Sequence, residues 1–386
     1  MIKRALVIGT GITGLTCARL LTCRGWEVHL LVSASQTSLT LLLNHVTRSL
    51  FQDIWRLDNS FWCQFNFLNR RHICWGSSNA LMSILPPDAV INGNQFAEFL
   101  LERLKRESKN VVFDHDSSAY SKLLNHPDGL QDLSQRFNFI IDASGRAATI
   151  AQQLGSGVPE AFGDRCAIAQ EVSLLQSCED KTYWIETVEN ALVFLAPLSA
   201  RRALLQVIVP RLLTESDQIL PSILEQTLSI GNQISDLVGS SSVFSAYPQI
   251  LGSLCGQVGL SGSTWMAVGD AAFCVDPISG DGTGYAIRGA ILATSIMNSI
   301  ACKLVDYNCG LHHYTLRLRK TFIAHLKACT DYYSIGFSSL PWQSEINLMK
   351  KAFVSDKFIQ AQSHELRHSL QDWRLLGSVA PIYPGT

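Results

Sequence analysis

A glycine-rich turn near the N-terminus constrains the fold more than any other feature of this 386-residue chain. A short apolar run, Ala5 to Ile8, leads into Gly9, Gly11 and Gly14, and a helical pattern follows. A strand, a tight G-x-G-x-x-G turn and a helix begin the βαβ unit that holds dinucleotide phosphates at a helix N-terminus. The sequence therefore predicts a Rossmann-like α/β domain.

The helix is expected over residues 14–23, and the next strand over residues 28–32. An acid that binds the ribose hydroxyls usually follows this second strand. This chain has Val32 there instead, followed by Ser33. We expect Ser33 and backbone groups to hold the ribose, and the alternative is weaker dinucleotide binding.

A second glycine-rich segment, WMAVGDAAFCVDPISGDGTGYAIRGA, occupies residues 265–290. Its apolar run ends at Gly269, and three glycines follow Pro277, so the backbone of this loop can approach a ligand closely. A helix is expected to begin near Thr283, and its first N–H groups would favour negative charge. The alternative is a surface turn before an ordinary helix.

A third segment, FNFIIDASGRAATIAQQLG, combines a predicted strand over residues 137–141 with the sequence DASGR over 142–146. Small residues at the end of a strand let the chain turn beside a ligand. A helix is expected from about residue 147 to 154. On local grounds alone, a strand followed by a type I turn explains the segment equally well.

These three segments, in this order over residues 5–290, resemble the FAD-dependent monooxygenase superfamily with the p-hydroxybenzoate hydroxylase fold. DASGR and the GDAA, DP and glycine pattern resemble its branch of flavin-dependent halogenases and geranylgeranyl reductases. The strings DPISGDGTGYAIR and ENALVFLAPLS resemble flavoproteins of the LodB and GoxB type, which are associated with maturing cysteine tryptophylquinone in amine or amino-acid oxidases. The resemblance implies that FAD is the cofactor.

The resemblance also implies which residues meet FAD. The first glycine turn would meet the pyrophosphate, Asp270 the ribitol or pyrophosphate, and the loop over residues 277–284 the isoalloxazine. The expected cofactor-binding residues are Gly9, Thr10, Gly11, Ile12, Thr13, Gly14, Ser33, Arg48, Asp142, Ala143, Gly145, Arg146, Gly269, Asp270, Pro277, Gly280, Asp281, Gly282, Thr283 and Gly284. Arg48 is included as a possible cation near the phosphates, with a solvated helix residue as the alternative. The sequence departs from the family at Gly93, where such proteins often carry an Arg.

The resemblance implies an FAD-dependent monooxygenase that hydroxylates a Trp side chain of a precursor protein during tryptophylquinone maturation of an amine or amino-acid oxidase. Its other partners would be O2 and an external reductant of unknown identity. One alternative is a monooxygenase or halogenase acting on a free aromatic molecule, although the halogenase string W-x-W-x-I-P does not occur. Another is a flavin-bearing maturation factor that binds the precursor without oxygenating it.

The catalytic side chains are unassigned, because no Ser/His/Asp or Cys/His constellation stands out. His45, His72 and His115 are candidate bases, and each has the alternative of a solvated or hydrogen-bonded histidine. The aromatic residues Tyr183 and Trp184 could line a substrate pocket, but core packing is the favoured interpretation.

Composition excludes several other classes of function. A net charge of -1 does not indicate a protein that binds nucleic acid, which would carry an excess of positive charge. The eleven cysteines are odd in number and lack C-x-x-C spacing, and the histidines form no metal pattern, so we expect no metal site. No signal-peptide pattern and no apolar run of membrane-spanning length occurs, so we expect a cytoplasmic protein without a membrane span.

The predicted fold class is α/β with two domains, a Rossmann-like FAD-binding domain and an inserted antiparallel-sheet substrate domain. A helical C-terminal region is expected to follow them. Strands are expected over residues 165–175, 181–188, 191–196 and 202–209, followed by a helix over about 218–238. The expected divisions are 1–75, 92–160 and 257–300 for the FAD-binding domain, 76–91 and 161–256 for the substrate domain, and 301–386 for the helical region.

Overall fold

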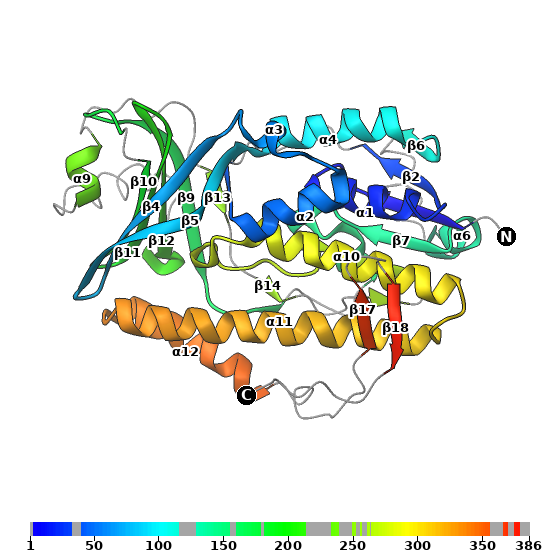
Figure 1. The fold of residues 1–386 in the computed structure, drawn as a ribbon. Coiled ribbons are helices and arrows are strands. Elements are labelled where there is room, and N and C mark those ends of the chain that lie inside the picture. The colour runs from blue at the N-terminus through cyan, green and yellow to red at the C-terminus, as the bar shows by residue number, and fades with distance from the viewer. Residues whose placement is uncertain are drawn as a thin grey trace.

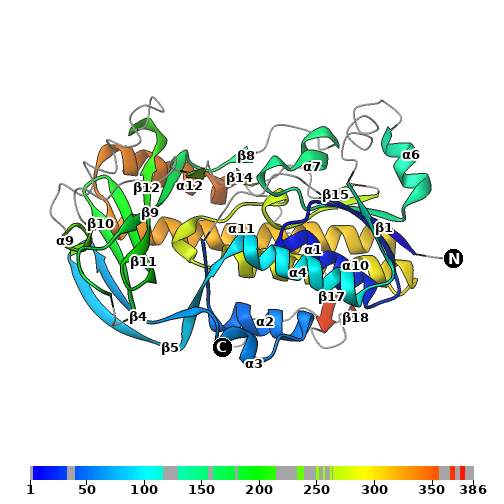
Figure 2. The same cartoon turned by 90° about the horizontal axis from the view of Figure 1, so that it is seen from above.

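Two β-sheets, one mostly parallel and one mostly antiparallel, dominate the fold (Figure 1). The computed structural model describes residues 3–32, 40–115, 129–154, 160–178, 181–213, 233–238, 249–251, 255–256, 261–262, 264–355, 366–369 and 374–378. The two sheets lie toward opposite ends of the molecule, and long helices run between them (Figures 1 and 2).

The first sheet has six strands in the order β15-β16-β7-β1-β2-β6. They are β1 (Arg4–Ile8), β2 (Glu27–Leu31), β6 (Val111–Asp114), β7 (Phe139–Asp142), β15 (Ser261–Gly262) and β16 (Trp265–Ala267). All neighbouring pairs are parallel except β15 and β16. Buried parallel strands read as unbroken apolar runs, and this explains the sequence ALVI in β1. The predicted α/β class is confirmed.

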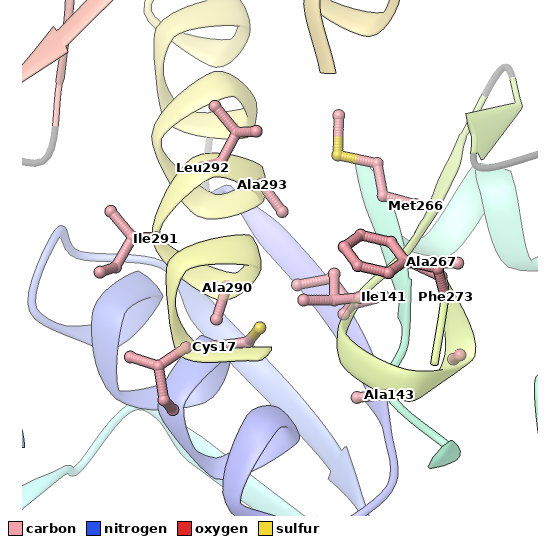
Figure 3. Close-up of a cluster of buried hydrophobic side chains, with 14 of the residues drawn as sticks. Cys17, Ile141, Ala143, Met266, Ala267, Phe273, Ala290, Ile291, Leu292 and Ala293 are labelled. Carbon is pink, nitrogen blue, oxygen red and sulfur yellow. The ribbon is translucent and has the colours of Figure 1, made fainter. Parts of the chain in front are cut away.

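Helix α1 (Ile12–Thr22) packs on β1 and β2, and α4 (Gly93–Glu107) and α10 (Gly282–Ala301) pack against α1. Small side chains permit the close approach. Ala290 and Ala293 lie on the side of α10 that faces Cys17 and Ile141, and all four are fully buried (Figure 3). The side of α10 that carries these alanines is therefore buried.

The shorter helices are α2 (His45–Trp55), α3 (Asn59–Trp62), α6 (Gly129–Arg136), α7 (Thr149–Leu154) and α9 (Gln233–Leu237), with 3-10 turns η1 (Gly145–Ala147), η2 (Arg211–Leu213), η4 (Gly269–Ala271) and η5 (Pro277–Ser279). The helix predicted over 147–154 is thus divided into η1 and α7. The break falls at Ala148, whose φ of 40° is left-handed and interrupts the helix. Of the helix predicted over 218–238, residues 218–232 lie outside the described residues.

The second sheet has eight strands in the order β13-β9-β12-β11-β10-β4-β5-β3. They are β3 (Thr40–Leu43), β4 (Asn66–Trp75), β5 (Ser78–Asn92), β9 (Arg165–Ser173), β10 (Thr182–Val188), β11 (Ala191–Ser199), β12 (Arg202–Pro210) and β13 (Gln249–Leu251). The four strands predicted between residues 165 and 209 are present. Neighbours are antiparallel except β4 and β10, which are parallel.

That parallel pair changes the expected division of the chain. Residues 66–75 were assigned with 1–75 to the FAD-binding domain, yet β4 hydrogen-bonds to β10 and β5 within the eight-stranded sheet. The strand β3 also joins this sheet, through β5. The division into domains otherwise remains a prediction.

The C-terminal region contains α11 (Tyr307–Gly336) and α12 (Leu340–Ser355). One face of α11 is buried, because Tyr314, Phe322 and Leu326 are all buried. Figure 1 shows α11 extending from the parallel sheet to the eight-stranded sheet. The expectation of a helical region up to residue 386 is wrong at its end, where β17 (Leu366–Ser369) and β18 (Arg374–Ser378) form a hairpin. A further two-stranded sheet joins β8 (Glu160–Ala161) and β14 (Cys255–Gly256).

The aromatic residues of β10 alternate between the two faces of the sheet. Trp184 packs in the cluster under α9, and Tyr183 packs in a separate cluster with Leu68 and Val90. Both rings are buried, so core packing accounts for them. No helix among the described residues is long and apolar enough to cross a membrane.

Candidate functional site

The three predicted segments meet at the carboxyl edge of the parallel sheet. Asp142 of β7 pairs with Ile8 of β1 and with Ala267 of β16. The strands therefore end side by side, and the chain leaves them at Gly9, Ala143 and Val268. Ligands of open α/β sheets bind at this edge.

The N-terminal glycine turn fits tightly against the end of β7. Gly9 has a φ of 111°, and a methyl group on it would lie 2.4 Å from the Ala143 carbonyl oxygen. A methyl group on Gly14 would lie 2.0 Å from the Gly9 carbonyl oxygen. Both positions therefore require glycine for packing, as the sequence pattern predicted.

Gly11 differs from the two packed glycines. A methyl group there would meet no atom within 4 Å, so packing does not explain the missing side chain. Helix α1 begins at this residue without a side-chain cap, which leaves its first N–H groups available to a ligand. The buried Oγ1 of the neighbouring Thr10 has no hydrogen-bond partner. An acceptor beside Gly11 would satisfy these donors.

The buried side chain of Asp142 stabilises the DASGR turn that follows β7. That side chain is fully buried, and Oδ1 accepts hydrogen bonds from the N–H and hydroxyl of Ser144. Oδ2 accepts from the N–H groups of Ile150 and Ala151 at 2.8 and 3.0 Å. The carboxylate therefore caps α7 and shapes the DASGR turn, and its internal bonds account for both oxygens.

Asp270 and Arg146 form the more open part of the same edge. Their side chains are 46% and 35% exposed, and Nε of Arg146 lies 3.9 Å from Oδ2 of Asp270. Gly269 has a φ of 64° and packs closely on the Thr13 side chain, which ties this turn to α1. The exposed pair is thus held beside the glycine turn and is accessible to a ligand.

The Pro277–Gly284 loop leads into α10, which begins without a side-chain cap on its first N–H groups. The Asp281 carboxylate instead faces α2: Oδ1 accepts hydrogen bonds from Asn44 and Thr47 at 3.0 and 2.8 Å. A methyl group on Gly284 would lie 2.1 Å from that same oxygen. A second uncapped helix start therefore stands at the site.

One predicted residue, Arg48, is not brought into this arrangement. The guanidinium of Arg48 donates to the Pro87 carbonyl oxygen at 2.6 Å and lies 4.9 Å from the centre of the Phe67 ring. These contacts tie Arg48 to the eight-stranded sheet. Burial lowers its pKa, and the nearby Asp88 opposes that shift. Ser33 lies outside the described residues.

The departures at Val32 and Gly93 have local explanations. The Val32 N–H donates to the Asp114 carbonyl oxygen at 2.8 Å, in continuation of the pairing of β2 with β6. Gly93 is the first residue of α4, and Asn92 caps that helix. Of the candidate bases, His45 and His115 are exposed, and His72 pairs with Asn79 across the β4–β5 hairpin. No contact in the described parts of the chain links these histidines to the sheet edge.

Comparison with known proteins establishes the fold. No family model matches the chain. Solved structures that resemble it include CmlS, a flavin-dependent halogenase, with a TM-score of 0.74 and 16% identity over 92% of this chain and 71% of CmlS. QhpG, a peptidyl tryptophan dihydroxylase essential for tryptophylquinone cofactor biogenesis, has a TM-score of 0.70 and 16% identity over 97% of this chain and 86% of QhpG. The chain has the fold of flavin-dependent halogenases and monooxygenases.

Further matches agree with this conclusion. PqsL from Pseudomonas aeruginosa, a probable FAD-dependent monooxygenase, has a TM-score of 0.65 and 15% identity over 92% of this chain and all of PqsL. Menaquinone reductases of Mycobacterium tuberculosis and Mycolicibacterium smegmatis are 44% identical over 41 residues. That stretch spans 11% of this chain and 10% of the reductases, so it does not transfer their activity.

A buried ionic cluster that the sequence did not predict lies beside the loop. Asp276 is fully buried, and its Oδ2 lies 3.0 Å from Nε of Arg165 on β9. Tyr333, His325 and Glu345 of the C-terminal helices complete the cluster. The one local feature in the sequence is that Asp276 precedes a proline. The partners of Asp276 are far away along the chain, so they form no local pattern with it. No group of three or more His, Cys, Asp or Glu in the described part of the chain could hold a metal ion.

Proposed function

We propose that this protein is an FAD-dependent monooxygenase. The observation that carries the proposal is the open space at Gly11 beside the uncapped start of α1, together with the buried hydroxyl of the neighbouring Thr10, which has no hydrogen-bond partner. Free N–H groups and a spare hydroxyl suit a pyrophosphate, which offers only acceptors. Bound FAD supplies the oxygen-transfer chemistry, and the chain supplies binding, orientation and exclusion of water.

Each part of the sheet edge has a role in this proposal. The turn from Gly9 to Gly14 would hold the pyrophosphate, Asp270 would accept hydrogen bonds from the ribityl chain, and Arg146 would supply a cation. The Pro277–Gly284 loop would bind the isoalloxazine, and the start of α10 would stabilise negative charge on it. Asp114, which pairs with Leu31 at the end of β2, offers an acid near the place where Val32 replaces the expected one.

The proposed substrate is a Trp side chain in the precursor of an amine or amino-acid oxidase that matures a tryptophylquinone cofactor. Support comes from the resemblance of DPISGDGTGYAIR to LodB- and GoxB-type proteins and from the likeness to QhpG, whose match covers 97% of this chain. An indole is electron-rich, so its oxygenation by a flavin enzyme requires no metal or nucleophilic side chain. O2 and an external reductant complete the reaction.

The likeness to CmlS and PqsL favours a second candidate, a monooxygenase or halogenase that acts on a free aromatic molecule. A third is a maturation factor that binds flavin and precursor but transfers no oxygen. The three candidates differ in what gains oxygen or halogen: a protein, a small molecule or neither.

Co-expression of this chain with the precursor of a tryptophylquinone enzyme distinguishes the three candidate functions. The purified chain should carry FAD, visible as a flavin absorption spectrum after release, and the precursor should gain the mass of one or two oxygen atoms at a Trp. Growth under ¹⁸O2 should move that gain to the heavier isotope. A flavin-loaded chain that leaves the precursor mass unchanged would contradict the protein substrate, and a chain that binds no flavin would contradict the whole proposal.

A further inference from the structure

The Asp276 carboxylate points into the protein interior, although its residue begins the loop proposed to face the flavin ring. Its Oδ2 accepts from Nε of Arg165 at 3.0 Å, and its Oδ1 accepts from the hydroxyl of Tyr333 at 2.7 Å. Its own N–H donates to Nε2 of His325 at 2.7 Å. Both backbone and side chain of this residue are therefore fixed by partners outside the loop.

The same cluster reaches the last described helix. Nη1 of Arg165 donates to Oε2 of Glu345 on α12 at 2.9 Å, and Glu345 also accepts from the N–H of Asp164 at 2.8 Å. The Arg165, Asp276 and Glu345 side chains are 2%, 0% and 6% exposed. One guanidinium thus joins β9, the loop and α12, and Tyr333 adds α11.

The charges in the cluster fit this bridging role. Burial alone would lower the pKa of Arg165, but Asp276 and Glu345 hold it above its ordinary value, so the guanidinium keeps its charge. Burial raises the pKa of Tyr333 well above its ordinary value, so its hydroxyl keeps the proton that it donates to Asp276. Arg165 presents its donors in a planar fork, which lets it hold two carboxylates at fixed angles.

A buried ionic cluster of this kind contributes little net free energy to folding. Removing charges from water costs several kcal/mol per ion, and well-packed apolar replacements are often as stable or more stable. What a buried, hydrogen-bonded cluster provides is a defined geometry. The geometry fixed here is that of the turn at Pro277.

The carboxylate transmits its position directly to that turn. Oδ1 of Asp276 also accepts from the N–H of Ile278 at 3.0 Å and caps η5. The Gly280 N–H then donates to the Pro277 carbonyl oxygen, and α10 begins two residues later. A shift of the carboxylate would therefore move the turn and the helix start together.

We propose that Arg165 and Tyr333 are positioning residues that act through Asp276, so that the C-terminal helices set where the Pro277–Gly280 turn meets the flavin ring. The inference rests on the proposed binding of FAD. Neither residue needs to touch the cofactor. The ring of Tyr333 is itself held by Trp342 of α12, with ring centroids 4.6 Å apart, so both helices control its position.

The sharpest test is Tyr333→Phe, which removes the donor to Asp276 and keeps the ring. Tyr332→Phe is the matched control, because it removes the neighbouring hydroxyl from a ring that is 57% exposed. Each purified protein is stripped of flavin and titrated with FAD, and the visible absorption and circular dichroism of the bound flavin are recorded. We expect Tyr333→Phe to shift these spectra and weaken FAD binding about fivefold, the loss of one hydrogen bond of about 1 kcal/mol, and Tyr332→Phe to match the wild type.

Arg165→Lys gives a stronger version of the test, because an ammonium cannot reproduce the two-carboxylate fork. We expect a larger spectral shift and at least tenfold weaker FAD binding. If this variant fails to fold, Tyr333→Phe still decides. Unchanged spectra and affinity in Tyr333→Phe, with or without a lower melting temperature, would overturn the positioning role. A wild-type protein that binds no FAD would instead overturn the proposed function.

Discussion

The two ends of the candidate site are built on different principles. At the end proposed to bind the pyrophosphate, here called the dinucleotide end, Gly9 and Gly14 allow the backbone to approach closely, with Ala143 as the neighbour of both. At the ring end, the Asp276 side chain is held by Arg165 and Tyr333, which come from distant parts of the sequence. One end is shaped by local sterics and the other by a long-range polar cluster.

This difference determines how each end responds to change. A backbone contact at van der Waals distance has no freedom to adjust, so an added methyl group must displace a helix or a strand. A hydrogen-bonded cluster can lose one member and keep its overall packing, at the cost of a less defined geometry. We therefore expect mutations of Gly9 and Gly14 to affect folding, and mutations of Arg165 and Tyr333 to affect the position of the loop.

The largest effect should come from Gly14→Ala. Alanine gains about 1 kcal/mol in helix propensity, but its methyl group would lie 2.0 Å from the Gly9 carbonyl oxygen. Overpacking of this kind costs roughly 1–3 kcal/mol and more when backbone must move. We expect a net loss of at least about 2 kcal/mol in the free energy of unfolding, measured by urea denaturation.

Gly11→Ala is the matched control for that prediction. Its methyl group meets no atom within 4 Å, and the φ of -66° suits alanine. The stability should stay within about 0.5 kcal/mol of wild type, whereas FAD binding should weaken because the methyl group enters the space assigned to the pyrophosphate. If Gly11→Ala bound FAD normally, that assignment would be wrong.

The same contrast explains what could be predicted from the sequence. The glycine spacing, the DASGR turn and the loop before α10 identified three segments that the structure brings together on adjacent strands. Local sterics and strand register determine this arrangement, and both leave short-range patterns. The sequence also placed Asp142 at the site, but its environment shows a residue that caps α7.

The ionic cluster left no such pattern. Arg165 is 111 residues from Asp276 and 180 residues from Glu345 in the sequence, and no periodicity links them. Their meeting depends on how α11 and α12 pack against both sheets. For the same reason residues 66–75 were grouped with the FAD-binding division, because the pairing of β4 with β10 joins segments that are far apart along the chain.

A smaller effect, dependent on pH, should appear at His325. Its Nε2 accepts the Asp276 N–H, so the ring is neutral, and burial lowers its pKa while Asp276 opposes the shift. The unfolded chain binds a proton near pH 6.5 and the folded protein does so only at lower pH. The stability contributed by the neutral ring is therefore complete above about pH 6.5 and is lost as the pH falls through the folded pKa.

His325→Gln tests this directly, because glutamine can accept the same N–H and does not titrate. We expect a cost of about 1 kcal/mol at pH 7.5 that shrinks toward pH 5.5, where the wild type loses its advantage. The measurement is urea denaturation at three pH values. His312→Gln, at an exposed position of the same helix, is the control and should show neither effect. A cost that stays constant across this range would contradict a buried neutral histidine.

The smallest effect on stability should come from Asp270→Asn, at the exposed part of the dinucleotide end. The Asp270 and Arg146 side chains are partly exposed and 3.9 Å apart, and such pairs contribute about 0–1 kcal/mol. The free energy of unfolding should therefore change by less than about 0.5 kcal/mol.

FAD binding by Asp270→Asn should weaken by roughly tenfold or more, because the cofactor loses a charge-assisted hydrogen bond. Fluorescence titration checks this against Asp53→Asn, which neutralises an exposed acid on α2. Equal FAD affinity in the two variants would remove Asp270 from the cofactor site and leave the glycine turn as the main support of the dinucleotide end.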